Sequence, residues 1–382
     1  MNKIKTMYQK AVRIRTIVCG LLFSIFSFVY LFVFQRDVLE ALHYSLAHGK
    51  THFSPMGSAL VMTLTLLFLT WGVNLVTSIK GRFHSLAYVP AFFVLMAISD
   101  VDREVYIHGG NGTWLWLLPS IFTLFIGLVL VLKKASHTKL DTNVSIAGLM
   151  GSNLLFLLIG CVATLTVGNT DENFHHELET ERYLREKNYS QAMKVGERSL
   201  EASQTLTALR AIAMTNAGAL GDELFSYPQY YGADGLFLPE DSLQALRYTN
   251  DSIYSLLGAR PYYGEGKLSY LRTLCHEDKG KFTALHYYLS ALLLKKRLDT
   301  FADELNNFYE PEDSLPIHFK EAILVYHQNH PKYPFVLADS MLIKRYSEYR
   351  CRQTEFHSRD IEKSQMRREF GNTYWWYHDY QE

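Results

Sequence analysis

One segment of the sequence concentrates side chains that could bind a cation or transfer a proton. Asp100, Asp102 and Glu104 alternate along the chain, and His108 precedes the glycine-rich residues 109 to 112. Carboxylate oxygens are preferred ligands of divalent cations, so one interpretation is an ion site in this loop. The spacing matches neither an EF-hand nor a phosphate-binding loop. The alternative interpretation is a loop at a membrane surface in which polar side chains simply collect.

A second candidate binding segment is the aromatic stretch from residue 225 to residue 239, which glycines and prolines interrupt. Tyr227, Tyr230, Tyr231 and Phe237 would suit stacking on sugar rings or holding a peptide. In the alternative interpretation these rings fill the gap between pairs of helices.

No catalytic residue, metal site or cofactor is predicted from the remaining motifs. No histidine lies in an HExxH frame, and neither a GxSxG motif nor cysteines at zinc-binding spacing occur. His327 and His330 precede Pro331, which indicates a helix end rather than a metal site. Cys275 and Cys351 could form a disulfide in an oxidising compartment, or remain two separate buried thiols.

The two parts of the chain carry opposite net charges. Residues 1 to 167 hold 13 Lys and Arg against 6 Asp and Glu, whereas residues 168 to 382 hold 25 against 32. The net charges are therefore +7 and −7. The second part lacks the basic character that neutralises phosphates, so we expect no nucleic-acid partner.

The first part contains five apolar stretches of membrane-spanning length. They are residues 17–34, 59–79, 83–99, 114–132 and 144–167. The third is short and contains Pro90, but the positive-inside rule favours its crossing. With five spans, ten Lys and Arg lie on the side of the N-terminus and three on the other side. We therefore predict a transmembrane domain at 1–167, an N-terminus in the cytoplasm and an extracytoplasmic domain at 168–382.

The predicted spans contain no Asp, Glu, Lys or Arg in their apolar cores. Pumps and proton-coupled transporters normally need such groups, so the sequence disfavours transport. Asn74 and Asn153 are expected to form hydrogen bonds between helices. Trp114 and Trp116 begin the fourth span and are typical of an interfacial aromatic belt.

The second part is expected to be α-helical. Apolar residues recur at helical spacing over 171–187, 190–201 and 205–217, with short connections between them. The segment from residue 183 to residue 203 resembles a tetratricopeptide (TPR) repeat in Tyr183-Leu184, in Tyr189 to Ala192 and in residues 200–203. Tyr189 stands where that motif has its loop-closing aromatic residue, and Ala192 stands where two helices of the motif touch closely. That resemblance implies an antiparallel helical stack.

Helical spacing continues along the second part, over residues 241–257, 265–276, 282–296, 300–309, 316–327 and 336–349. Strand patterns are nearly absent, so the predicted fold is all-α, a five-helix membrane bundle followed by a TPR-like domain. The aromatic tail at residues 370–380 is expected to dock on this domain, or alternatively on the membrane interface.

This arrangement resembles a group of uncharacterised bacterial inner-membrane proteins with five spans and an extracytoplasmic helical domain. The resemblance implies a location in the inner membrane and no particular activity. The leading hypothesis is a scaffold that recruits an envelope protein or peptide, with no catalysis. The alternative is an enzyme or accessory subunit that acts on envelope glycans or lipid-linked sugars.

Overall fold

The structure is a computed structural model that describes residues 2–79, 81–105, 112–136, 146–197, 199, 201–239 and 247–381. All regular secondary structure in these residues is helical. The described chain forms two compact units, one of residues up to His175 and one that begins at His176.

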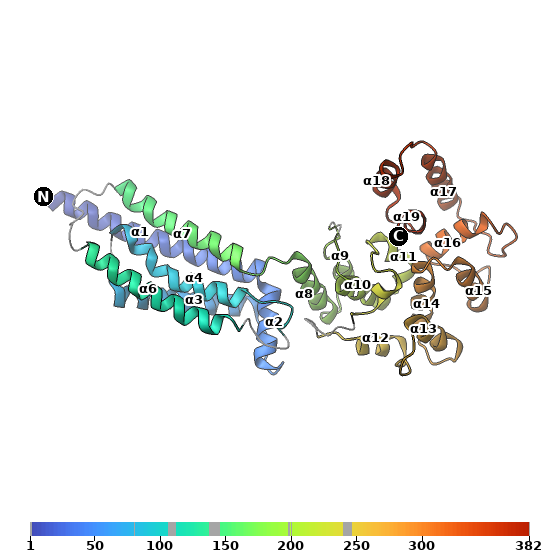
Figure 1. The fold of residues 1–382 in the computed structure, drawn as a ribbon, viewed down its shortest axis with the longest axis horizontal. Coiled ribbons are helices and arrows are strands. Elements are labelled where there is room, and N and C mark those ends of the chain that lie inside the picture. The colour runs from blue at the N-terminus through green and yellow to red at the C-terminus, as the bar shows by residue number, and fades with distance from the viewer. Residues whose placement is uncertain are drawn as a thin grey trace. The chain divides into compact units, whose positions relative to one another are not determined.

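In the residues that the structure describes, the first unit has five long helical segments that lie side by side (Figure 1). Its elements are α1 (Asn2–Val29), a π-helical turn (Tyr30–Phe34), α2 (Arg36–Ala47), α3 (Pro55–Thr77), a 3₁₀ helix (Gly81–Tyr88), α4 (Val89–Ser99), α6 (Trp114–Ser136), α7 (Ile146–Val167) and the start of α8 (Glu172–Arg185). Helix α7 packs against α1 and α4. Helix α3 also packs against α1 and α4.

Five of these segments are long and apolar enough to cross a membrane. They are Gln9–Phe34, Pro55–Thr77, Gly81–Ser99, Trp114–Val131 and Ala147–Val167, so the doubtful third segment is among them. Many of their large apolar side chains are exposed, such as Phe68 and Val76. Such a surface is compatible with a multi-pass membrane protein. Trp116 is exposed as expected of an interfacial residue, but Trp114 is buried and donates a hydrogen bond to Asp100.

Asn153 joins the fifth apolar helix to the start of the third. Its Oδ1 accepts hydrogen bonds from the backbone nitrogen and the hydroxyl of Ser85, at 2.8 and 2.9 Å, and its Nδ2 donates to the carbonyl of Gly81 at 3.2 Å. Asn153 is fully buried. Backbone groups of a 3₁₀ helix in an apolar setting need hydrogen-bond partners. Asn153 supplies them to the 3₁₀ helix that precedes Pro90 and so stabilises this irregular part of the third apolar segment.

One end of the bundle is closed by hydrogen bonds around residues 164 to 169. Gln35 Nε2 donates to the hydroxyl of Tyr30 at 3.2 Å and to the carbonyl of Asn169 at 3.1 Å, and the Asn169 amide donates to the carbonyl of Ser99 at 2.9 Å. A Cβ at Gly168 would collide with the Tyr30 hydroxyl and lie 2.8 Å from the Ser99 hydroxyl. The close approach of three segments therefore requires glycine at this position.

The described residues of the second unit form eleven further helices. They are α9 (Tyr189–Lys194), α10 (Gln204–Ala217), α11 (Leu220–Glu223), α12 (Asn250–Leu257), α13 (Lys267–His276), α14 (Phe282–Leu294), α15 (Leu298–Phe308), α16 (Ile317–His327), α17 (Ser340–Gln353), α18 (Arg359–Phe370) and α19 (Tyr374–Tyr380), with short 3₁₀ helices at Leu224–Ser226 and Gly232–Leu236. Helices α10 and α14 are buried on nearly all sides, as a helix in the centre of a domain must be.

The aromatic tail docks on the protein, as the sequence indicated. Tyr374 and Trp375 are fully buried, and Tyr349 of α17 donates a hydrogen bond to the Trp375 carbonyl at 3.2 Å. The rings of Tyr346 and Trp375 lie 4.8 Å apart. Helices α17, α18 and α19 therefore share an aromatic core.

The second helix of the segment that resembles a TPR repeat is much shorter than predicted. Helix α9 ends at Lys194, whereas the expected helix continued to residue 201. Gly196 adopts a φ of +62°, and a Cβ there would lie 2.8 Å from His176 Nδ1 and 3.0 Å from an Arg210 nitrogen. The chain leaves the helix because this glycine allows it to pass close to both side chains.

Two other expectations change in detail. Helix α17 begins at Ser340 rather than 336, because the Asp339 side chain accepts a hydrogen bond from the Leu342 amide and caps the helix there. In the helix expected over 241–257, residues 241–246 lie outside the described residues and α12 begins at Asn250. Cys275 and Cys351 are unpaired, and Cys351 is exposed rather than buried.

Replacing Asn153 by leucine keeps the side-chain volume but removes the acceptor of the Ser85 amide and hydroxyl. We expect the free energy of unfolding to fall by about 1 to 2 kcal/mol. The measurement is unfolding of the purified protein by SDS titration in mixed micelles. Thr166→Val on the same helix, where the hydroxyl bonds only to its own helix, is the matched control. Equal stability of the two variants would contradict the role assigned to Asn153.

Candidate functional site

The acidic residues that suggested an ion site take part in local structure. Asp100 Oδ2 accepts the hydrogen bond from Trp114 at 2.7 Å, and Asp102 Oδ1 accepts one from the Glu104 amide at 3.0 Å. His108 lies outside the described residues. In the part of the chain that the structure describes, no three His, Cys, Asp or Glu side chains form a group able to hold a metal ion. The carboxylates here therefore build the loop that follows α4.

The aromatic stretch 225–239 divides into buried and exposed rings. Phe237 is buried, with its ring 6.2 Å from that of Tyr287. Tyr227 is 9% exposed, whereas Tyr230 and Tyr231 are each 40% exposed. The buried rings fill space between helices, as one of the two interpretations expected. Tyr230 lies beside a groove that the same stretch helps to form, because its hydroxyl accepts a hydrogen bond from the lining residue Arg367.

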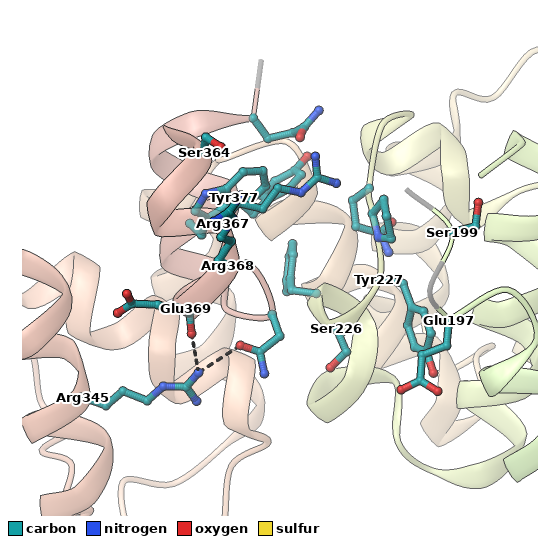
Figure 2. Close-up of a pocket in the computed structure, with 17 residues that line it drawn as sticks. Glu197, Ser199, Ser226, Tyr227, Arg345, Ser364, Arg367, Arg368, Glu369 and Tyr377 are labelled. Carbon is teal, nitrogen blue, oxygen red and sulfur yellow. Dashed lines mark hydrogen bonds between the residues drawn. The ribbon is translucent and has the colours of Figure 1, made fainter. Parts of the chain in front are cut away.

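This groove has a volume of about 690 Å³ and lies within the second unit (Figure 2). One wall comes from the loop at 225–229 with Glu197 and Ser199, and the other from α18 with Arg345 of α17. The complete lining is Glu197, Ser199, Phe225, Ser226, Tyr227, Pro228, Gln229, Arg345, Ser364, Arg367, Arg368, Glu369, Gly371, Asn372, Trp376, Tyr377 and Gln381. Its size falls within the range of sites for small molecules and short peptide segments.

Three arginines line the α18 side of the groove. Arg345 donates to Asn372 Oδ1 at 3.0 Å, and Arg367 donates to the Tyr230 hydroxyl at 2.9 Å (Figure 2 shows the former). Arg368 is exposed. Glu369, on the same helix, pairs with Arg352 at 2.6 Å. The side chains on this wall therefore present mainly hydrogen-bond donors and positive charge.

The loop wall is held from behind by a buried arginine. The guanidinium of Arg210 lies 4.7 Å from the centre of the Tyr227 ring and donates to the Val195 carbonyl. Burial lowers the pKa of Arg210 to about 10, and it remains charged near neutral pH. Burial also raises the pKa of Tyr227, so its hydroxyl stays protonated. Gln229 Nε2 donates to the Leu224 carbonyl at 2.7 Å and fixes the turn of the loop.

A buried carboxylate on α16 holds the two walls in place. Glu321 Oε2 accepts hydrogen bonds from His318 Nδ1 at 2.8 Å and from the backbone amide of Tyr374 at 2.7 Å. On the other side of the imidazole, the Phe225 amide donates to His318 Nε2 at 3.3 Å. The loop wall is thus tied to α16 through Phe225. The tail, whose Trp376 and Tyr377 also line the groove, is tied to the same helix through Tyr374.

The residues that give the groove its charge are absent from the candidates suggested by sequence. Arg345, Arg367 and Arg368 belong to no motif, and 22 residues separate Arg345 from Arg367. Of the predicted residues that the structure describes, Tyr227 alone lines the groove, while Tyr230 contacts Arg367 next to it. The sequence signal that could have indicated this site is the pair Arg367-Arg368 just before the aromatic tail. That signal is weak without knowledge of the fold.

Fold and groove together define a class of protein. The chain is all-helical in its described residues, with five helices that could cross a membrane and a helical unit that carries an open groove. The chain belongs to the family described as a family of unknown function (DUF6057), which matches residues 110–270 and 243–381. The matched ranges contain α6, α7 and every residue that lines the groove.

The comparisons with curated proteins and with solved structures give no match.

Replacing Glu321 by glutamine keeps the shape of the side chain but removes the charge that His318 and the Tyr374 amide contact. We expect the free energy of unfolding to fall by about 1.5 to 3 kcal/mol, the usual value of hydrogen bonds to a charged group. Limited proteolysis with chymotrypsin is the second measurement, since release of the tail exposes its aromatic cleavage sites. Glu348→Gln, at an exposed position of α17, should change neither result. An intact, protease-resistant tail in the Glu321 variant would contradict this role.

Proposed function

We propose that this chain is a membrane-anchored scaffold whose helical second unit holds a peptide segment of a partner protein in the groove between the 225–229 loop and α18. The observation that carries the proposal is the groove itself, an open site of about 690 Å³ in a chain that also has five apolar helices. In this proposal the apolar helices lie in the bacterial inner membrane, and the second unit recruits an envelope protein.

The choice of a peptide over a glycan rests on the state of the aromatic rings. Sugar rings stack on exposed aromatic faces. Among the rings of the groove, Tyr227 is 9%, Trp376 6% and Tyr377 5% exposed. Each also has a cation against it, from Arg210, Arg367 and Lys296 respectively. None offers a free stacking face, so polar contacts to side chains and backbone carry the recognition, as in peptide binding.

The helical construction of the unit also favours a scaffold. Helices α13, α14, α15 and α16 follow one another with short connections and pack successively, a construction that TPR-like scaffolds use to present a groove. An enzyme acting on glycans draws less support, because Asp100 and Asp102 have structural partners.

The distribution of Lys and Arg supports a second unit on the extracytoplasmic side, and Cys351 offers a native reporter for it. Cys351 is exposed, whereas Cys19 is buried and burial raises the pKa of Cys275 to about 12. Thiolates react with maleimides, so Cys351 should react first. We expect a membrane-impermeant maleimide added to intact cells to label the protein, and Cys351→Ser to abolish the label. Labelling only after the cells are lysed would place the unit in the cytoplasm.

Filling the groove should remove partner binding without unfolding the protein. Ser364 is an exposed residue of α18 that lines the groove, and Ser347 is an exposed residue of α17 outside it. We expect Ser364→Trp to lose a protein that the wild type retains after cross-linking and purification from native membranes, as read by mass spectrometry. Ser347→Trp adds the same bulk elsewhere and should retain that protein.

Two outcomes of this experiment oppose the proposal. Equal recovery of the partner by both variants would place its binding outside the groove. Recovery of a bound glycan or lipid in place of a protein would favour the enzyme or accessory role.

A further inference from the structure

We propose that the groove selects acidic peptide segments, because Arg345, Arg367 and Arg368 form an anion-binding wall for their carboxylates. This inference rests on the proposed function and adds the chemical class of the ligand. The inference concerns the charge of the bound peptide. The groove could bind neutral or basic peptides, in which case the proposed function would hold and this inference would be wrong.

The first argument is that these three arginines have no acidic partner. Among the described residues, none of them forms an ion pair within 4.0 Å, and Arg368 forms no hydrogen bond either. Among the described residues, the acidic one that lines this wall, Glu369, is paired with Arg352 at 2.6 Å. Three positive charges therefore face the groove without compensation from the wall that carries them.

The second argument is that two of the three guanidinium groups are already positioned. Arg367 lies over the Trp376 ring, 5.4 Å from its centre, and donates to the Tyr230 hydroxyl. Arg345 lies 5.9 Å from the centre of the Phe370 ring and donates to Asn372. These contacts fix each side chain while its partners carry no negative charge. A ligand carboxylate can thus bind at a smaller cost in side-chain entropy.

The third argument is the sign of the surrounding charge. Residues 168 to 382 contain 25 Lys and Arg against 32 Asp and Glu, so the wall is opposite in sign to the segment that bears it. Glu197, on the loop wall, is exposed and acidic. An acidic ligand is repelled by most of this segment and attracted at one place, which gives the site both specificity and orientation.

The chemistry of the arginine fork selects the bound group. A guanidinium offers parallel N–H donors that match the two oxygens of a carboxylate. A peptide with Asp or Glu side chains supplies several carboxylates along an extended backbone, which suits three arginines drawn from two helices. A long, highly charged polyanion would extend beyond the three arginines, where Glu197 and the negative net charge of residues 168 to 382 would repel it.

The test uses the full-length protein in lipid nanodiscs and a displayed library of random octapeptides. Selection on the wild type, after depletion of the library on Ser364→Trp, retains peptides that need the open groove. We expect these peptides to be enriched in Asp and Glu. An enriched peptide is then labelled with fluorescein, and its affinity is measured by fluorescence anisotropy against the variants and at increasing salt concentration.

Arg368→Glu is the main variant, because Arg368 makes no hydrogen bond or ion pair to another described residue and its loss leaves the fold intact. We expect it to weaken binding of the acidic peptide by about tenfold or more, the usual consequence of losing a charge-assisted contact. Lys363→Glu makes the same charge change on the same helix outside the groove, and should alter affinity by less than about twofold, as expected of a distant solvent-exposed charge. Affinity should also fall as salt concentration rises.

Each alternative result overturns the inference and is distinguishable from failure of the proposed function. If the selected peptides are neutral or basic and still require the open groove, the site binds peptides but not by their acidity. If no peptide is selected while Ser364→Trp still loses its partner from membranes, the groove acts on another class of ligand. Polygalacturonate and unlabelled acidic peptide are also compared as competitors of the labelled peptide. If polygalacturonate competes at the lower concentration, the arginine wall binds an acidic polysaccharide instead. Equal effects of Arg368→Glu and Lys363→Glu would show that the wall makes no specific contact.

Discussion

The second unit depends on one buried carboxylate. Glu321 is 1% exposed and His318 is 2% exposed, so the ion would be costly to bury without partners. It has two, His318 Nδ1 and the amide of Tyr374, and the Glu321 carbonyl accepts a further hydrogen bond from the Trp375 indole at 3.0 Å. Loss of either partner would leave a charge uncompensated in the interior. The tail therefore cannot leave α16 without a large loss of free energy.

The hydrogen bonds of Glu321 and His318 also position the loop and the tail that border the groove. Tyr374 is the first residue of α19, and helix N-termini have amides that need acceptors. Glu321 supplies one acceptor and the Thr373 hydroxyl another, through the Trp376 amide at 3.3 Å. Because the Phe225 amide donates to His318 Nε2, the ring carries its proton on Nδ1 and can donate to Glu321. The His318 imidazole thus links the loop to the tail, and the Phe225 ring also packs directly against the rings of Tyr374 and Tyr377.

Sequence reasoning identified the elements more reliably than the site. Helical periodicity and length predicted the five apolar helices and most helices of the second part, because these properties are local. The end of α9 was missed because it depends on Gly196 lying close to His176 and Arg210, which are 20 and 14 residues away in the sequence and belong to other helices. The site was missed for the same reason. A groove whose walls come from the loop at 225 and from α18 has no sequence pattern of its own, and Asp100 drew attention although its partner is an indole.

The family match sharpens where the shared property of these proteins should be sought. The matched ranges begin at residue 110, after α1, α3 and α4, and continue almost to the end of the chain. They contain Glu321 and His318, both walls of the groove, and only the last two of the five apolar helices. If anchoring alone defined the family, the first three apolar helices would be expected within the match as readily as the last two. The match instead follows the polypeptide that builds the groove, where Arg345, Arg367 and Arg368 pair with no acidic group among the described residues and neutral groups position the first two.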